Sequence, residues 1–186
     1  MQGLAGRFVE AVDWASERLS RIASWCVLLA CGISAVNAMV RYGFNIGSNA
    51  WLELQWYLFG AVFMLAAAYT LQRNEHIRID ILSSRLSKRT RDLIDIAGHS
   101  LMLLPFTALM IYLCWPFFFG AYRSGEMSGS AGGLIIWPAR SFILLGFVLL
   151  FAQGISELIK RIAVIRELIP DPYANSESSH VPVEQP

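Results

Sequence analysis

Four long apolar stretches divide this chain, and polar segments separate them. The stretches cover about residues 22–40, 50–71, 93–119 and 136–159. A helix that crosses a hydrocarbon core of roughly 30 Å needs about 20 predominantly apolar residues, and each stretch is close to that length or longer. The pattern therefore predicts an all-α integral membrane protein, with four transmembrane helices in a domain at residues 22–169.

The two ends of the chain follow different patterns. In residues 1–21, apolar side chains recur at spacings of three and four while charged side chains occupy the other side, which is typical of an amphipathic helix. This N-terminal segment either lies in the membrane interface or extends the first span, and the sequence leaves both possibilities open. Residues 170–186 are rich in Pro, Ser and Glu, which predicts a disordered tail.

Helix boundaries are indicated by a few particular residues. Asn49 is placed to cap the start of the second span, and Pro138 falls in the first turn of the fourth, where its missing N–H costs little. Pro105 predicts a bend in the third span. The glycine- and serine-rich residues 120–133 predict a loop between the third and fourth spans.

Basic residues gather on one side of the predicted membrane. Of the 15 Lys and Arg residues, twelve lie in the amino-terminal segment, the middle loop and the carboxyl-terminal end. By the positive-inside rule, this distribution predicts that both termini and the middle loop are cytoplasmic.

Composition agrees with a membrane protein and excludes other classes. Hydrophobic residues make up 55% of the chain and charged residues only 16%. The net charge of +1 indicates no basic field for nucleic acid. Cys26, Cys31 and Cys114 all lie in apolar runs without paired spacing, so they indicate neither a disulfide framework nor a zinc site.

The polar residues in or near the spans suggest no catalytic centre. Glu53 lies in the first turn of the second span, where a carboxylate suits the helix dipole. Glu157 precedes Lys160 and Arg161 at the spacing of surface ion pairs. Of the histidines, His99 alone falls inside a predicted span, which does not favour paired haem ligation. We therefore predict no enzyme, no cofactor and no metal site.

Several motifs, taken together, resemble a known family. They are Glu53-Leu54-Gln55-Trp56-Tyr57-Leu58-Phe59-Gly60, Ala68-Tyr69-Thr70-Leu71, Asn74-Glu75-His76-Ile77-Arg78-Ile79-Asp80, Gly125-Glu126 with Ser128, Gly132-Gly133-Leu134, Trp137-Pro138, Gly146-Phe147 and Gln153-Gly154. In this order they resemble the small membrane subunit of TRAP transporters, the tripartite ATP-independent periplasmic transporters. The matches span two helices and two loops.

The resemblance implies a multi-pass protein of the bacterial or archaeal inner membrane. Its partners would be a large membrane subunit, which carries the substrate and sodium sites, a periplasmic substrate-binding protein, and membrane lipids. The small subunit would scaffold the large one, and the glycine motifs resemble the branch that takes up organic acids. The alternative from another class is the membrane anchor of a respiratory oxidoreductase.

Two groups of residues carry the hypotheses about contacts. Small and aromatic residues on the first two spans are expected to meet the large subunit, since small residues let helices approach closely: Ala30, Ser34, Ala38, Glu53, Trp56, Gly60 and Ala67. Residues of the basic middle loop are expected to anchor the chain against headgroups at the cytoplasmic face: Arg73, His76, Arg78, Arg85, Lys88, Arg89 and Arg91.

Overall fold

The structure is a computed structural model that describes residues 3–73, 88–166, 168 and 169. In these residues the chain is helical apart from short connections and one isolated β-bridge between Met127 and Ile135. The helices are α1 (Leu4–Phe44), α2 (Asn49–Gln72), α4 (Lys88–Gly98), the π-helical turn η1 (His99–Leu103), α5 (Leu104–Ser124) and α6 (Trp137–Ile165).

Four helical segments in the described part of the chain are long and apolar enough to cross a membrane. They are α1, α2, the continuous path Leu93–Ser124 through the end of α4, η1 and α5, and α6. The all-α class with four spans is therefore confirmed. The predicted tail at 170–186 lies outside the described residues.

The first span and the amphipathic segment before it form one uninterrupted helix. α1 has 41 residues, and at a rise of about 1.5 Å per residue it is about 60 Å long, roughly twice the hydrocarbon core. The amino-terminal residues thus extend the first span, which was one of the two possibilities that the sequence left open.

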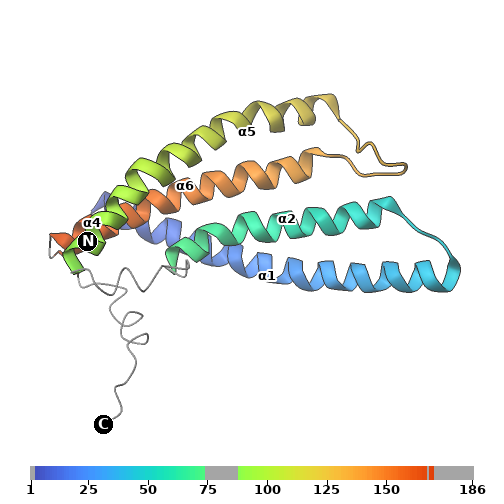
Figure 1. Cartoon of the computed structure of the whole chain (residues 1–186), viewed down its shortest axis with the longest axis horizontal. Coiled ribbons are helices and arrows are strands. Elements are labelled where there is room, and N and C mark those ends of the chain that lie inside the picture. Colours follow the sequence, from blue (N-terminus) through green and yellow to red (C-terminus); the bar gives the residue numbers. More distant parts are fainter. Residues whose placement is uncertain (1–2, 74–87, 167, 170–186) are drawn as a thin grey trace, which may run out of the picture.

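The helices lie side by side in one layer, in the order α5, α6, α2, α1, when the molecule is viewed down its shortest axis (Figure 1). α2 packs against α1 and α6, and α6 packs against α2 and α5. The amino-terminal part of α1 also crosses to contact α6 (Figure 1). A single layer leaves much of each helix without a neighbour in the chain, including Trp25 of α1 (66% exposed) and Phe63 of α2 (78% exposed).

Close packing at a few buried residues holds the layer together. Ala23, Ala61 and Leu65 form the buried core between α1 and α2, and aliphatic and aromatic side chains pack around them. Where α2 meets α6, a Cβ added to Gly146 would lie 2.6 Å from the Cβ of Met64 and 2.9 Å from its carbonyl oxygen. Only glycine permits this approach of the two backbones.

The end of α5 and the role of Asn49 differ from the predictions. α5 continues to Ser124 and ends at Gly125, whose left-handed φ of 62° lets its N–H close the helix on the carbonyl of Ala121. The predicted loop at 120–133 therefore begins five residues later. Asn49 is not an N-cap, because its side chain donates instead to the carbonyl of Ala131, 3.0 Å away in that loop.

The third span changes its hydrogen bonding just before Pro105. In η1 the N–H of Leu104 donates to the carbonyl of His99, five residues back, as in a π-helix. Pro105 follows in the first turn of α5 and has no N–H to continue the α-helical pattern.

Candidate functional site

Glu53 joins the start of α2 to the loop between α5 and α6. The N–H of Leu134 donates to Glu53 Oε2 over 2.7 Å, and the hydroxyl of Ser128 donates to Glu53 Oε1. Gly133 lies so close that an added Cβ would be 2.9 Å from both carboxylate oxygens and 2.7 Å from the Cβ of Ser128. The carboxylate is therefore enclosed by loop backbone and hydroxyl groups, in an arrangement that we name the Glu53 clasp (Glu53, Ser128, Gly133 and Leu134).

Further bonds fix the loop on both sides of the Glu53 clasp. Tyr57, one turn after Glu53, donates its hydroxyl to the carbonyl of Ile135 over 3.2 Å. Arg140, in the first turn of α6, forms a 3.0 Å ion pair with Glu126 and places its guanidinium 4.0 Å from the centre of the Phe117 ring. The loop is thus tied to α2, α5 and α6 at once.

A second polar cluster lies at the opposite end of the layer, between α1 and α6. Lys160 Nζ is 2.8 Å from Asp13 Oδ2 and 2.8 Å from Glu157 Oε1. Gln153 donates to Asp13 over 2.9 Å and to Glu157 over 3.0 Å, and its own carbonyl accepts the hydroxyl of Ser16 at 2.8 Å. We call these five residues the α1–α6 lock.

The α1–α6 lock is buried although it is charged. Gln153 is 0% exposed, Glu157 3% and Lys160 9%. The ion pair of Glu157 with Lys160 is present as the spacing predicted, but the prediction that it is a surface pair is wrong. Arg161 also lies in the interior, where its Nη2 is 3.2 Å from Asp95 Oδ2 of α4.

Sequence reasoning missed the α1–α6 lock because its halves lie 147 residues apart. The available signal was a polar stripe on α6, where residues 153, 156, 157 and 160 share one helical face. A second polar pair, Asp13 and Ser16, lies one turn apart in the amphipathic segment. Two matching polar stripes on apolar helices indicate mutual hydrogen bonding more than two separate solvated faces.

The residues expected at a partner interface have different positions in the structure. Ala30 is fully buried within the chain, Glu53 is half-buried in its clasp, and Ala67 is half-buried. Ser34, Ala38, Trp56 and Gly60 are exposed, with Trp56 at 77%. A Cβ added at Gly60 would meet nothing within 4 Å.

The residues expected to anchor the chain are described only in part. Arg73 is exposed at the end of α2, where its Nε donates to the Tyr69 hydroxyl over 2.9 Å. His76, Arg78 and Arg85 lie outside the described residues. Lys88, Arg89 and Arg91 belong to α4, and the structure describes their backbone alone.

The two polar clusters stabilise the fold, because one joins α1 to α6 and the other joins the loop before α6 to α2. Among these residues, no group of three His, Cys, Asp or Glu side chains could hold a metal ion. His99 uses its Nδ1 to contact the carbonyl of Asp95 in its own helix, 2.6 Å away. The geometry defines a multi-pass membrane protein whose ionic and hydrogen-bonded clusters hold its own helices and loop in place.

Comparison with known families identifies which membrane protein this is. Residues 30–164 match the model of the DctQ component of the tripartite ATP-independent periplasmic transporters. The match covers more than half of the chain, so the chain belongs to this family and is a small subunit of a TRAP transporter. Comparisons with curated proteins and with solved structures gave no match. Membership in a family of transporter components does not favour the alternative of a respiratory membrane anchor.

Three of the motifs that carried the resemblance meet in space. Glu53 begins the motif at residues 53–60, Ser128 belongs to the motif at residues 125–128, and Gly133 and Leu134 belong to the motif at residues 132–134. The Glu53 clasp brings all four together across 75 to 81 residues of sequence.

Proposed function

We propose that this chain scaffolds the large membrane subunit of a sodium-coupled TRAP transporter that takes up organic acids together with a periplasmic substrate-binding protein. Family membership is the observation that supports this proposal most strongly. The small subunit supplies no transport path of its own, and its contribution is a fixed helical wall for the subunit that moves substrate.

The single layer of helices supports a scaffolding role. Helices that pack in one layer bury little of one another, so their wide apolar faces need lipid or another protein around them (Figure 1). Trp56 and Gly60 lie one turn apart on such a face of α2, and both are exposed. A large aromatic side chain beside an open glycine offers a projection and a recess to a facing helix.

We assign the large-subunit interface to the exposed members of the expected set: Ser34, Ala38, Trp56 and Gly60. Ala30 and Glu53 contribute to it by shaping α1 and α2 from inside the chain, since one is buried and the other holds the loop. Ala67 lies further along α2 and is half-buried.

Substitution at Gly60 tests the interface. Gly60→Trp fills space that is open in the isolated chain, so the variant should fold and insert normally but fail to bring down the large subunit when purified by an affinity tag. Sodium-driven uptake of a radiolabelled organic acid into proteoliposomes of the complete transporter should fall in parallel. Arg123→Gln, an exposed change in the last turn of α5, is the control. Wild-type complex recovery and uptake by Gly60→Trp would refute the interface assignment.

The proposed orientation places both termini and the basic middle loop in the cytoplasm, with the chain in the inner membrane. Seven residues at this face would then lie near anionic headgroups of the inner leaflet: Arg73, His76, Arg78, Arg85, Lys88, Arg89 and Arg91. Reporter fusions in the connections at residues 44–48 and 125–130 test this directly. Both should report a periplasmic position, and a cytoplasmic signal from either one would overturn the topology.

A further inference from the structure

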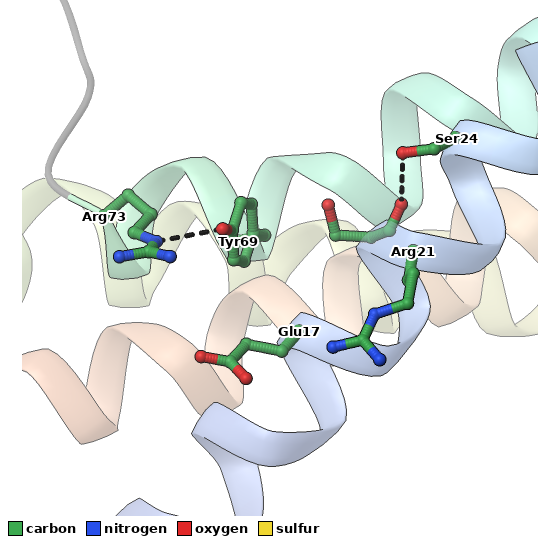
Figure 2. Close-up of a pocket in the computed structure, with 6 residues that line it drawn as sticks. Glu17, Arg21, Ser24, Tyr69 and Arg73 are labelled. Carbon is green, nitrogen blue, oxygen red and sulfur yellow. Dashed lines mark hydrogen bonds between the residues drawn. The ribbon is translucent and has the colours of Figure 1, made fainter.

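A polar hollow of about 310 Å³ opens between α1 and α2. Its lining consists of Glu17, Ser20, Arg21 and Ser24 of α1 with Tyr69 and Arg73 of α2. Figure 2 shows the two helices contributing side chains from opposite sides of the hollow. The hollow is large enough to admit a tetrahedral anion.

Two guanidinium groups and the hydroxyl-bearing residues Ser20, Ser24 and Tyr69 lie around this hollow. Arg73 is held in place by donating from Nε to the Tyr69 hydroxyl at 2.9 Å, with its guanidinium carbon 5.4 Å from the centre of the tyrosine ring. Arg21 is exposed and forms no ion pair with any residue that the structure describes. Arginine presents planar pairs of N–H donors that match the oxygens of a phosphate group.

The position of the hollow along the helices is that of a membrane boundary. On α1, Arg21 is the last charged residue before the uncharged run that starts at Ile22. On α2, Arg73 directly follows Gln72, where the apolar helix ends. Charged and hydroxyl groups from two helices therefore gather at the depth where lipid headgroups lie.

We infer that this hollow binds the phosphodiester group of a membrane phospholipid, with Arg21 and Arg73 as its charged donors. The hydroxyl of Tyr69 accepts a hydrogen bond from Arg73 Nε and so holds this guanidinium, which also lies over the tyrosine ring. The acyl chains would then run along the exposed apolar surfaces of α1 and α2.

Glu17 makes the hollow selective for a diester. A phosphodiester carries one negative charge, whereas a free phosphate carries close to two above its second pKa. The Glu17 carboxylate in the lining disfavours the additional charge by like-charge repulsion, and it can accept a hydrogen bond from an ammonium or hydroxyl group of a headgroup. The phosphodiester of a lipid headgroup thus suits the charges of the hollow better than inorganic phosphate does.

Native mass spectrometry of the purified, delipidated full chain tests this inference. Phosphatidylglycerol, phosphatidylethanolamine and inorganic phosphate are titrated separately, and the bound fraction is measured for each. A basic side chain near a membrane surface strengthens lipid binding about fivefold, so Arg21→Gln should weaken phospholipid binding about fivefold and Arg21→Gln/Arg73→Gln roughly 25-fold.

Arg18→Gln is the matched control, because Arg18 lies on the same turn of α1 but faces Trp14 and not the hollow. It should bind phospholipid as the wild type does. Wild-type binding by the double variant, an equal loss in Arg18→Gln, or displacement of the lipid by inorganic phosphate at equal concentration would each overturn the inference. Arg21→Gln removes no hydrogen bond or ion pair with a described residue, so it keeps the test decisive even where the double variant folds poorly.

The inference rests on the proposed orientation of the chain in the membrane but not on binding of the large subunit. Lipid binding is measured on the isolated chain, while the scaffolding proposal is tested by recovery of the complex. Failure of one therefore leaves the other standing.

Discussion

Removing the cation of the α1–α6 lock should strongly destabilise the chain. In Lys160→Met, the carboxylates of Asp13 and Glu157 lose the ammonium group that lies 2.8 Å from each. Removing one partner of a buried ion pair typically costs about 3–5 kcal/mol, because a charge is left buried without compensation. Since a quarter of the Asp13 side chain is exposed, we expect a value near the low end, about 3 kcal/mol.

Thermal unfolding in a mild detergent measures this loss. For a chain of this size, 1 kcal/mol corresponds to a shift of about 2–4 °C in Tm, so Lys160→Met should melt roughly 6–12 °C below the wild type. Arg166→Met, which removes an exposed basic residue at the end of α6, is the control and should melt with the wild type.

A triple variant separates charge from packing. Asp13→Asn, Glu157→Gln and Lys160→Met together remove all three charges of the α1–α6 lock, and replacing a whole buried ion pair is often close to neutral. The triple variant should therefore recover most of the lost stability. A Tm of Lys160→Met within 2 °C of the wild type, or a triple variant as unstable as the single one, would refute the assignment of the cost to uncompensated charge.

Three other substitutions test the loop and the helix contacts. Glu53→Ala leaves the N–H of Leu134 without its acceptor, which should cost about 1–3 kcal/mol and speed proteolysis of the loop at 125–136; an unchanged cleavage rate would contradict this. Gly133→Ala should lower the free energy of unfolding by about 1–3 kcal/mol, because the added methyl overpacks against the Glu53 carboxylate. In the double variant Glu53→Ala/Gly133→Ala the total loss should be smaller than the sum of the two single losses, and a loss equal to that sum would show that the two sites are independent. Gly146→Leu should lower the yield of folded protein because it forces α2 and α6 apart, while Gly60→Leu should keep the wild-type Tm; equal stability of the two variants would show that the α2–α6 approach is not tight.

The fold class followed from the sequence because a membrane imposes a simple rule. Each crossing needs about 20 apolar residues in a helix, so counting apolar runs located all four spans. The same rule says nothing about how far a helix continues beyond the membrane, and α1 and α5 were underestimated for that reason. A glycine- and serine-rich run indicated a loop, but only the left-handed backbone of Gly125 marks where the helix ends.

The candidate site was less accessible to sequence reasoning, for a physical reason. Glu53 was singled out as a first-turn carboxylate and a candidate for the partner interface. It lies beyond the first turn of α2, and its partners lie 75 and 81 residues away and include a backbone N–H, which no side-chain pattern reveals. For Lys160, helical spacing predicted the ion pair with Glu157 but not its burial, because burial depends on where a distant helix packs. Local periodicity identifies which side chains share a face, and tertiary packing decides what that face meets.

The length of α1 gives the α1–α6 lock a mechanical consequence. A straight helix behaves as a stiff rod, and a tilt of about 10° about its midpoint would swing each end of a rod about 60 Å long by roughly 5 Å. The α1–α6 lock binds α1 to α6 near one end of α1, at Asp13 and Ser16, while the connection to α2 at residues 45–48 restrains the other end. Because these two restraints lie far apart along α1, each acts on a long lever arm and opposes tilting. A few hydrogen bonds near one end of α1 therefore fix the angle at which the whole helix crosses the membrane.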